Sequence, residues 1–274
     1  MSTATIDATV ALNTRVGVDS KPVTFARAAK AEWVKFRSLR SSWAVLGGAV
    51  LGVLSIGLVV AYNTRNVTAN QDPVDLAPSA TLQGYLLGEL LIGALGVLFV
   101  SSEFGTGMIR STLAAVPKRL PVLWAKLAVF AAVAAVAMTA ITVVTFVSAQ
   151  ALIGHYRTGY SLSDSGVWRI VLGTGLYLTL VGVIGGTIGW LVRSTPGALV
   201  TFFALFLVLP VFGSIFGSVG KDVAQFLPSR AGAAFISSNP ASPSLSAGAG
   251  LLVLVGWVGG GIILAAGSLR RRDA

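Results

Sequence analysis

Long apolar runs alternate with short polar stretches along most of this chain, and this alternation predicts its architecture. A membrane-spanning helix needs about 20 predominantly apolar residues. Runs of this kind lie at 43–62, 82–101, 121–153, 167–192, 196–218 and 247–268. The pattern therefore predicts an all-α, polytopic integral membrane protein, whose six transmembrane helices form one domain over residues 43–274.

The segment ahead of the first run, residues 22–42, has a helical periodicity of its own. Its apolar positions recur every three or four residues, as on one face of an α-helix; they are Phe25, Ala29, Trp33, Phe36 and Leu39. Basic residues occupy the other side. Such a segment is typical of an amphipathic helix that lies in the headgroup plane of a membrane. Residues 1–21 form a polar N-terminal tail.

Glu32 interrupts this pattern, because it falls among the apolar positions. One interpretation is a local ion pair with Lys35, three residues later, which contributes only about 0.2–0.5 kcal/mol. The alternative is that Glu32 faces protein and pairs with a basic residue of the polar stretch at 103–119, or contacts a cytoplasmic partner. The sequence leaves both interpretations open.

The polar stretch at 103–119 separates the second apolar run from the third. It begins with Glu103, continues through a Gly-Thr-Gly sequence, and ends with Lys118 and Arg119. A loop that only connected two spans could be much shorter. The length and the apolar positions inside the stretch predict a short helix outside the membrane, which presents a docking surface to the cytoplasm.

Composition and charge support a membrane protein and predict its orientation. The chain is 54% hydrophobic and 11% charged, whereas soluble domains contain about 25% charged residues. With both termini in the cytoplasm, the external basic residues are only Arg65, Arg157, Arg169, Lys221 and Arg230, out of 20 in all. This bias follows the positive-inside rule. Because the basic residues are scattered between apolar runs, a nucleic-acid partner is not expected.

The sequence offers little catalytic chemistry. It has no cysteine and one histidine, His155, so thiol catalysis and cysteine or multi-histidine metal sites are excluded. No phosphate-binding loop of the form G-x-x-x-x-G-K-[ST] is found, and no nucleophile elbow surrounds a serine. The chain is therefore not expected to be an enzyme, and any nucleotide hydrolysis is expected in another subunit.

Glu89 is the one carboxylate well inside a predicted span. Acidic residues in the membrane are costly and mark functional positions by default, so Glu89 is a candidate for the transport route or a subunit seam. The alternative is that it is protonated, or solvated near the outer interface.

Glycine pairs four residues apart recur inside the spans. They are Gly48/Gly52, Gly84/Gly88, Gly182/Gly186, Gly185/Gly189 and Gly256/Gly260. Such pairs let helices approach closely, either within one chain or at a dimer seam.

An ordered set of segments gives the chain a family resemblance. The segments are AEWVKFRSLRSSW before the first span, EFGTGMIRSTLAAVPKRLPVLWAKL after the second, LVRSTPGALVTFFALFLVLP, QFLPSRAGAAF, and a final span ending in LRRRDA. In this order they resemble the membrane (permease) subunit of bacterial type-2 ATP-binding-cassette (ABC) transporters. The resemblance covers residues 22–274.

The resemblance implies roles for several segments. Residues 22–42 would be the connecting helix, with Glu32, Trp33, Lys35 and Phe36. Residues 103–119 would be the coupling helix that docks an ATPase subunit, through Glu103, Gly105, Thr106, Ile109, Arg110 and Leu113. Arg193 and Ser194 would form a second cytoplasmic contact. Residues 219–245 would form an external re-entrant segment, with Pro228 in the external gate.

The implied function is that of an ATP-driven permease, most simply an exporter of a hydrophobic or amphipathic substrate such as a drug, an antimicrobial peptide or a lipid-like molecule. Its partners would be a separate ATPase that binds ATP and magnesium, a second identical or related permease, and membrane lipid. No cofactor is expected in this chain. The expected location is the bacterial cell membrane, with both termini cytoplasmic. The alternative is an ATP-independent secondary transporter or channel; a membrane-embedded sensory or scaffold subunit is a third possibility.

Overall fold

The computed structural model of the chain describes residues 24–66, 78–108, 120–156, 158–215, 217–238 and 245–271. Secondary structure within these residues is helical, and no strand is found among them. Six helices in the described part are long and apolar enough to cross a membrane. The predicted all-α class and the six spans are therefore confirmed, and the chain is a multi-pass membrane protein by length and composition of its helices.

The spans lie close to their predicted positions. They are α2 (Arg40–Thr64), α3 (Tyr85–Gly105), α5 (Leu120–Gly154), α6 (Val167–Val192), the segment α7–η2–α8 (Thr195–Ile215) and α11 (Ala247–Arg271). A short 3₁₀ helix, η1 (Ala80–Leu82), precedes α3. The ends differ from the predicted ones by a few residues, because polar residues such as Arg40 and Asn63 continue the helix beyond the apolar run.

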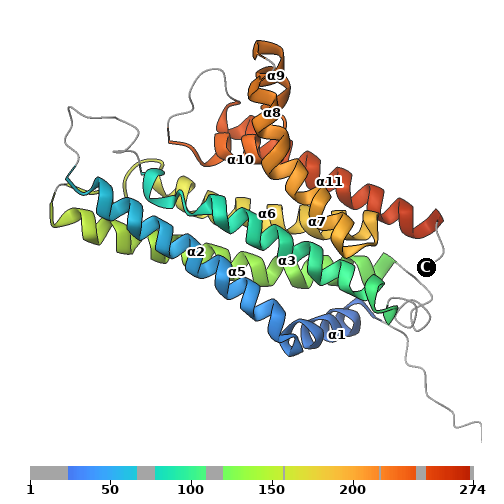
Figure 1. Cartoon of the computed structure of the whole chain (residues 1–274). Coiled ribbons are helices and arrows are strands. Elements are labelled where there is room, and N and C mark those ends of the chain that lie inside the picture. The colour runs from blue at the N-terminus through green and yellow to red at the C-terminus, as the bar shows by residue number, and fades with distance from the viewer. Residues whose placement is uncertain are drawn as a thin grey trace, which may run out of the picture.

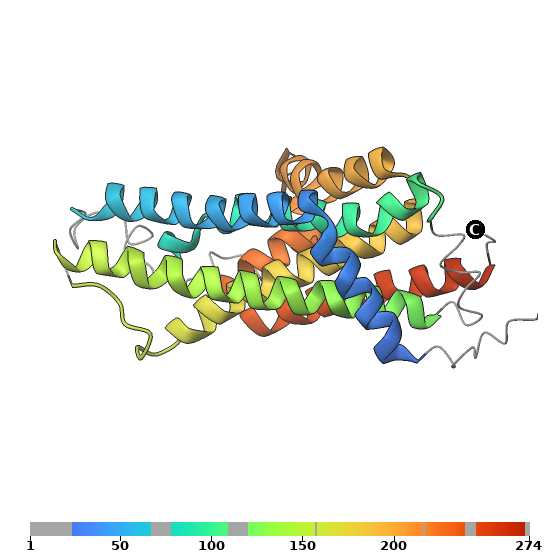
Figure 2. The same cartoon turned by 90° about the horizontal axis from the view of Figure 1, so that it is seen from below.

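Helix α6 is the centre of the bundle. It packs against α3, α5, α7, α10 and α11, and most of its residues are buried. Figures 1 and 2 show α2, α3, α5 and α6 running side by side along the long axis of the molecule, with the α7–η2–α8 segment and α11 beside them. The hydrophobic core accordingly lies between α3, α5 and α6.

Glycines bring α3 and α6 into backbone contact. A Cβ added to Gly96 would clash with the carbonyl oxygen of Gly182, and one added to Gly185 would clash with that of Gly93. The Gly182, Gly185, Gly186 and Gly189 positions all face residues of α3 or α5. The two glycine pairs of α6 thus serve packing within one chain.

The remaining glycine pairs divide into two groups. Gly52 faces Leu87, and both Gly84 and Gly88 face Val53, so these glycines join α2 to α3. In contrast, nothing in the described part of the chain lies within 4 Å of a Cβ built on Gly256 or Gly260 in α11. Intrachain packing therefore accounts for every pair except the last.

The fifth span contains a π-helical turn ahead of a proline. Helix α7 (Thr195–Phe203) passes into η2 (Ala204–Val208), where the N–H of Leu209 bonds to the carbonyl of Ala204, and then into α8 (Leu209–Ile215). Pro210 has no N–H, and its ring cannot approach the carbonyl four residues before it. The extra residue in the π turn accommodates the proline without ending the span.

Two short helices follow the fifth span. They are α9 (Gly217–Ala224) and α10 (Pro228–Ile236), and α10 packs against α6 and α11. Arg169 at the start of α6 donates to the carbonyls of Phe235 (2.6 Å) and Ser237 (3.2 Å), which caps the C-terminal end of α10. The predicted segment 219–245 contains the end of α9 and all of α10, joined by a turn at 225–227, and residues 239–244 lie outside the described part.

Helix α1 (Phe25–Ser38) is shorter than the segment 22–42 predicted for it. Leu39 has an extended conformation and ends the helix, and residues 40–42 already belong to α2. The backbone therefore turns a corner at Leu39, and the N–H of the Trp43 ring donates to the carbonyl of Arg37 (3.2 Å) across it. Figure 2 shows α1 crossing obliquely over the N-terminal half of α5, against which it packs.

The side of α1 that faces the bundle differs from the predicted apolar face. Glu32 and Phe36 are buried, whereas Phe25, Trp33 and Leu39 are exposed. The ring of Phe36 makes edge contacts with Trp43 and Phe99. The difference arises because α1 packs against α5 and α2, and the side toward α5 has to accommodate a buried lysine.

Candidate functional site

A cluster of four charged side chains joins α1, α3 and α5 at the end of the bundle where α3 stops and α5 begins. Glu32 and Lys35 come from α1, Glu103 from the last turn of α3, and Lys126 from the second turn of α5. The Lys126 ammonium lies 2.6 Å from Glu32 Oε2 and 2.8 Å from Glu103 Oε1. The Lys35 ammonium lies 3.0 Å from Glu32 Oε1 and 2.9 Å from Glu103 Oε1. We call these four residues the charge cluster.

Burial makes the charge cluster different from a surface ion pair. The side chain of Lys126 is 1% exposed, and those of Glu32 and Glu103 are 4% and 7% exposed. Breaking a buried pair is strongly destabilising, because it leaves an uncompensated charge out of water. Two acids balance two bases here, and the Lys126 ammonium also stands 4.5 Å from the centre of the Phe99 ring. These ion pairs connect each of the helices α1, α3 and α5 to the other two.

Lys35 is the most exposed member of the charge cluster, and it lies outside the spans. Burial lowers its pKa, but the hydrogen bond to Glu103 and the negative charges of Glu32 and Glu103 outweigh burial, so the pKa is raised from its ordinary 10.5. Lys35 is therefore charged throughout the neutral range.

The position of Glu32 combines the interpretations that the sequence left open. It pairs locally with Lys35, and it also faces protein, where its second carboxylate oxygen pairs with Lys126. The basic partners that the structure describes for Glu32 come from α1 and α5, while the basic residues of the 103–119 stretch lie outside the described residues. Lys126 is buried in the second turn of α5, where two carboxylates converge on its ammonium group.

The predicted docking residues fall into three groups. Gly105 and Thr106 are exposed at the end of α3, where Thr106 is the C-cap and its hydroxyl donates to the carbonyl of Ser102 (3.0 Å). Glu103 is buried in the charge cluster, so its carboxylate is directed to α1 and α5 instead of outward. Ile109, Arg110 and Leu113, with the rest of 109–119, lie outside the described residues.

Among the predicted connecting-helix residues, Trp33 is exposed, while Phe36 is fully buried. Arg193 and Ser194 form the turn between α6 and α7, where Arg193 has a left-handed backbone (φ 58°). The Arg193 guanidinium donates to the carbonyl of Ser268 in α11 (3.3 Å) and lies 5.6 Å from the Phe104 ring. Arg193 thus connects the ends of α3, α6 and α11 at the same end of the molecule as the charge cluster.

Glu89 lies inside the bundle between α3 and α6. Its carboxylate is buried and accepts a hydrogen bond from the hydroxyl of Tyr177, whose ring makes an edge contact with Tyr85. Tyr85 lines a cavity of about 190 Å³ together with Thr174 and residues of α10. This packing places Glu89 within a single chain and not on an outward helix face.

Pro228, the predicted external-gate residue, is buried at the first turn of α10. A proline is well placed there, because the backbone N–H groups of the first turn have no hydrogen-bond partner within the helix, so a residue without an N–H loses no bond.

The residue that periodicity alone missed is Lys126. The available signal was electrostatic: two acidic residues near a membrane boundary require basic partners, and Lys126 is the basic residue one turn into the third span.

No set of three or more histidine, cysteine, aspartate or glutamate side chains that could hold a metal ion is found in the part of the chain that the structure describes. No protein-family model matches the chain, and a comparison with characterised proteins finds no match.

Proposed function

We propose that this chain is the membrane subunit of a type-2 ABC transporter, driven by a separate ATPase. The observation that carries the proposal is the charge cluster, which links α1 to the ends of the two spans on either side of the predicted coupling stretch 103–119. Six apolar helices and the ordered sequence segments are compatible with it. The proposed location is the bacterial cell membrane with both termini in the cytoplasm, in line with the charge bias.

The charge cluster suggests how force would reach the membrane. An ATPase docked on the stretch 103–119 would move the end of α3, and Glu103 would transmit that movement to Lys126 in α5 and to Lys35 in α1. Paired charges of this kind, most of them buried, favour movement of the three helices as a unit, because separating them would leave unpaired charge out of water. ATP and magnesium would act in the partner subunit, and this chain would convert its closure into tilting of the spans.

In this proposal two permease chains, identical or related, enclose a route for a hydrophobic or amphipathic substrate, most simply in the export direction. Glu89 would act from inside one chain, by holding α3 against α6 through Tyr177. In the proposal, Glu89 is a positioning group, because its contact with Tyr177 connects the two helices. Tilting of α3 would therefore also move α6.

The test is copurification of an ATPase with the tagged chain from its own host in mild detergent. We expect ATP hydrolysis and a polypeptide with a phosphate-binding loop in the preparation. Arg110→Glu should remove both without changing the yield of the chain, since it alters the docking stretch and replaces none of the four residues of the charge cluster. Lys221→Glu in α9 is the matched control, because it reverses an exposed basic residue at the far end of the fifth span.

Three other outcomes are informative. A chain that is isolated alone and transports in liposomes without ATP would contradict the proposal and favour an ion-driven transporter or channel. An ATPase that remains bound in Arg110→Glu would place docking elsewhere. An ATPase that binds a chain with no transport activity would indicate a sensory or scaffold subunit.

A further inference from the structure

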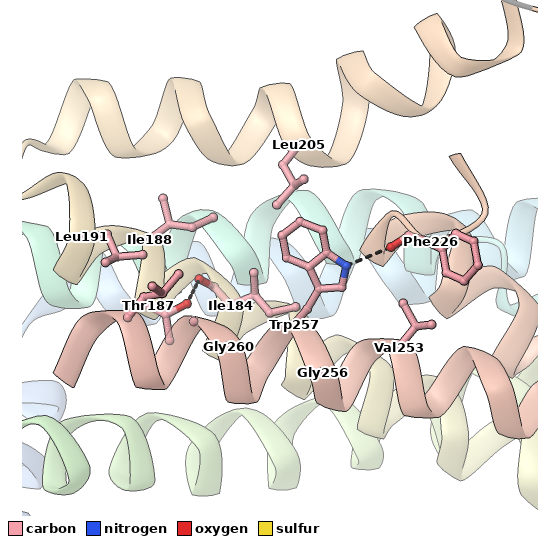
Figure 3. A pocket seen from close by; sticks show the side chains of 12 residues that line it. Ile184, Thr187, Ile188, Leu191, Leu205, Phe226, Val253, Gly256, Trp257 and Gly260 are labelled. Carbon is pink, nitrogen blue, oxygen red and sulfur yellow. Dashed lines mark hydrogen bonds between the residues drawn. The ribbon is translucent and has the colours of Figure 1, made fainter. Parts of the chain in front are cut away.

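An apolar groove runs along α11, between α6 and the π turn of the fifth span. Its volume is about 490 Å³, and Figure 3 shows the indole of Trp257 standing between α11 and Leu205. Other lining residues are Ile184, Thr187, Phe226 and Leu264. The two polar groups among these side chains are satisfied internally, since Thr187 donates to the carbonyl of Ile184 (2.7 Å) and Trp257 to that of Phe226 (2.9 Å). The groove therefore presents an apolar surface.

Glycines of α11 keep the groove open. Gly256 and Gly260 line it, and no atom of the residues that the structure describes approaches within 4 Å of a Cβ built on either one. Atoms of neighbouring helices occupy the space beside the glycine pairs of the other spans, so this pair is the exception. An unfilled groove loses the dispersion contacts that a partner would provide.

The length of the groove matches one leaflet of a bilayer. From Val253 to Leu264, α11 rises about 17 Å, while half of the hydrocarbon core is about 15 Å thick. Arg270 follows about 9 Å further along the helix, at the outer edge of a headgroup region that is about 5–8 Å thick. Arg270 is exposed, and Arg193 approaches the same helix end at Ser268. An apolar channel of leaflet length thus ends near basic side chains.

We propose that this groove binds one acyl chain of an anionic phospholipid, whose phosphate lies beside Arg270. The leaflet is the one that contains the C-terminal end of α11. The acyl chain fills the space over Gly256 and Gly260, and the guanidinium attracts the phosphate. Apolar contact alone would not distinguish the site from the surrounding lipid, so selectivity comes from the charge at the end of the groove. The inference is independent of the transporter proposal.

The experiment measures the lipid that the full-length chain retains. The chain is reconstituted in vesicles of equal parts phosphatidylglycerol and phosphatidylcholine, extracted into mild detergent, washed and weighed by native mass spectrometry. Gly260→Leu fills the groove, and Gly267→Leu is the matched control, because it adds the same side chain at another open position of α11 outside the groove. Gly256→Leu serves as a second filling variant if Gly260→Leu does not fold.

We expect one phosphatidylglycerol on wild type and on Gly267→Leu, and a loss of about fivefold or more in the filling variant as packing contacts disappear. Arg270→Gln should retain about fivefold less phosphatidylglycerol, because it removes one basic residue at the membrane surface. Phosphatidylglycerol with brominated acyl chains should quench the Trp257 fluorescence of wild type, measured as the difference from Trp257→Phe, and should quench it less in Gly260→Leu.

Four results would overturn the inference. They are equal retention by Gly260→Leu and Gly267→Leu, no retained lipid on wild type, equal retention of phosphatidylcholine and phosphatidylglycerol, and a wild-type dimer that Gly260→Leu converts to a monomer. The last would show that the groove receives a helix of a second copy of the chain.

Discussion

At the scale of single residues, the chain is mostly apolar, but a few buried polar side chains have defined partners on other helices. Lys126 is held by two carboxylates, Glu89 by the Tyr177 hydroxyl, and Arg169 by the carbonyls at the end of α10. Each contact joins helices that are far apart in sequence. Their removal is expected to cost more than the loss of a surface interaction.

Lys126→Met should lower the stability of the chain by about 3–5 kcal/mol, because it removes from two buried carboxylates a basic partner that both of them contact. The thermal unfolding midpoint in detergent should fall by about 10 °C. Lys221→Met, which alters an exposed lysine, should change stability by no more than about 0.5 kcal/mol.

The double variant Glu32→Gln/Lys126→Met is the internal check on this prediction. It restores the charge balance between Glu103 and Lys35, so it should recover part of the lost stability. A double variant less stable than Lys126→Met would show that the effect comes from packing and not from unpaired charge.

At the scale of elements, close helix contacts and short helices determine how the spans fit together. The α3–α6 contact depends on glycines on both helices, whereas the fifth span depends on a π turn to accommodate Pro210. Helix α1 joins the bundle through charge and through Phe36, not through an uninterrupted apolar stripe. Each element therefore has a different reason for its position.

Gly96→Ala should destabilise the bundle by about 1–3 kcal/mol, because its methyl group would press on the backbone of α6 at Gly182. Gly47→Ala is the matched control: no atom lies within 4 Å of the added carbon, and the change should be neutral or stabilising by up to about 1 kcal/mol. Thermal unfolding of the two variants in the same detergent is the measurement. Equal midpoints would mean that α3 can shift away from α6 at no cost.

At the scale of the whole molecule, the six spans place the charge cluster, the α6–α7 turn and the end of α11 at one end. The sequence predicts that this end faces the cytoplasm, because most of the basic residues lie there. The proposed ATPase docking and the proposed lipid site both lie at or near this end. Orientation is therefore the global property on which the functional proposals depend.

The absence of cysteine from the sequence makes a direct test of orientation possible. Thr106→Cys and His155→Cys each introduce one thiol at an exposed position, after α3 and after α5 respectively. A membrane-impermeant maleimide should label only His155→Cys in intact cells and both variants after permeabilisation. The cysteine-free parent gives the background, and labelling of Thr106→Cys in intact cells would reverse the predicted topology.

The sequence by itself determined the helical class and the approximate positions of the six spans. A bilayer requires each crossing segment to satisfy its own backbone hydrogen bonds, so an apolar run of sufficient length becomes a helix whatever its neighbours are. The same reasoning placed Glu89 inside a span. It also marked Glu32 as an exception to the amphipathic pattern of its segment.

Only the tertiary structure decided which faces of those helices meet. The partners of Glu32 and Glu103 depend on how α1 crosses α5, and Phe36 is buried while Trp33 is exposed for the same reason. Helical periodicity describes one helix at a time, so it cannot say which side a neighbour covers. Five similar glycine pairs were therefore equivalent in sequence, yet four are packed within the chain, and Gly256/Gly260 lines an open groove because no helix among the described residues covers it.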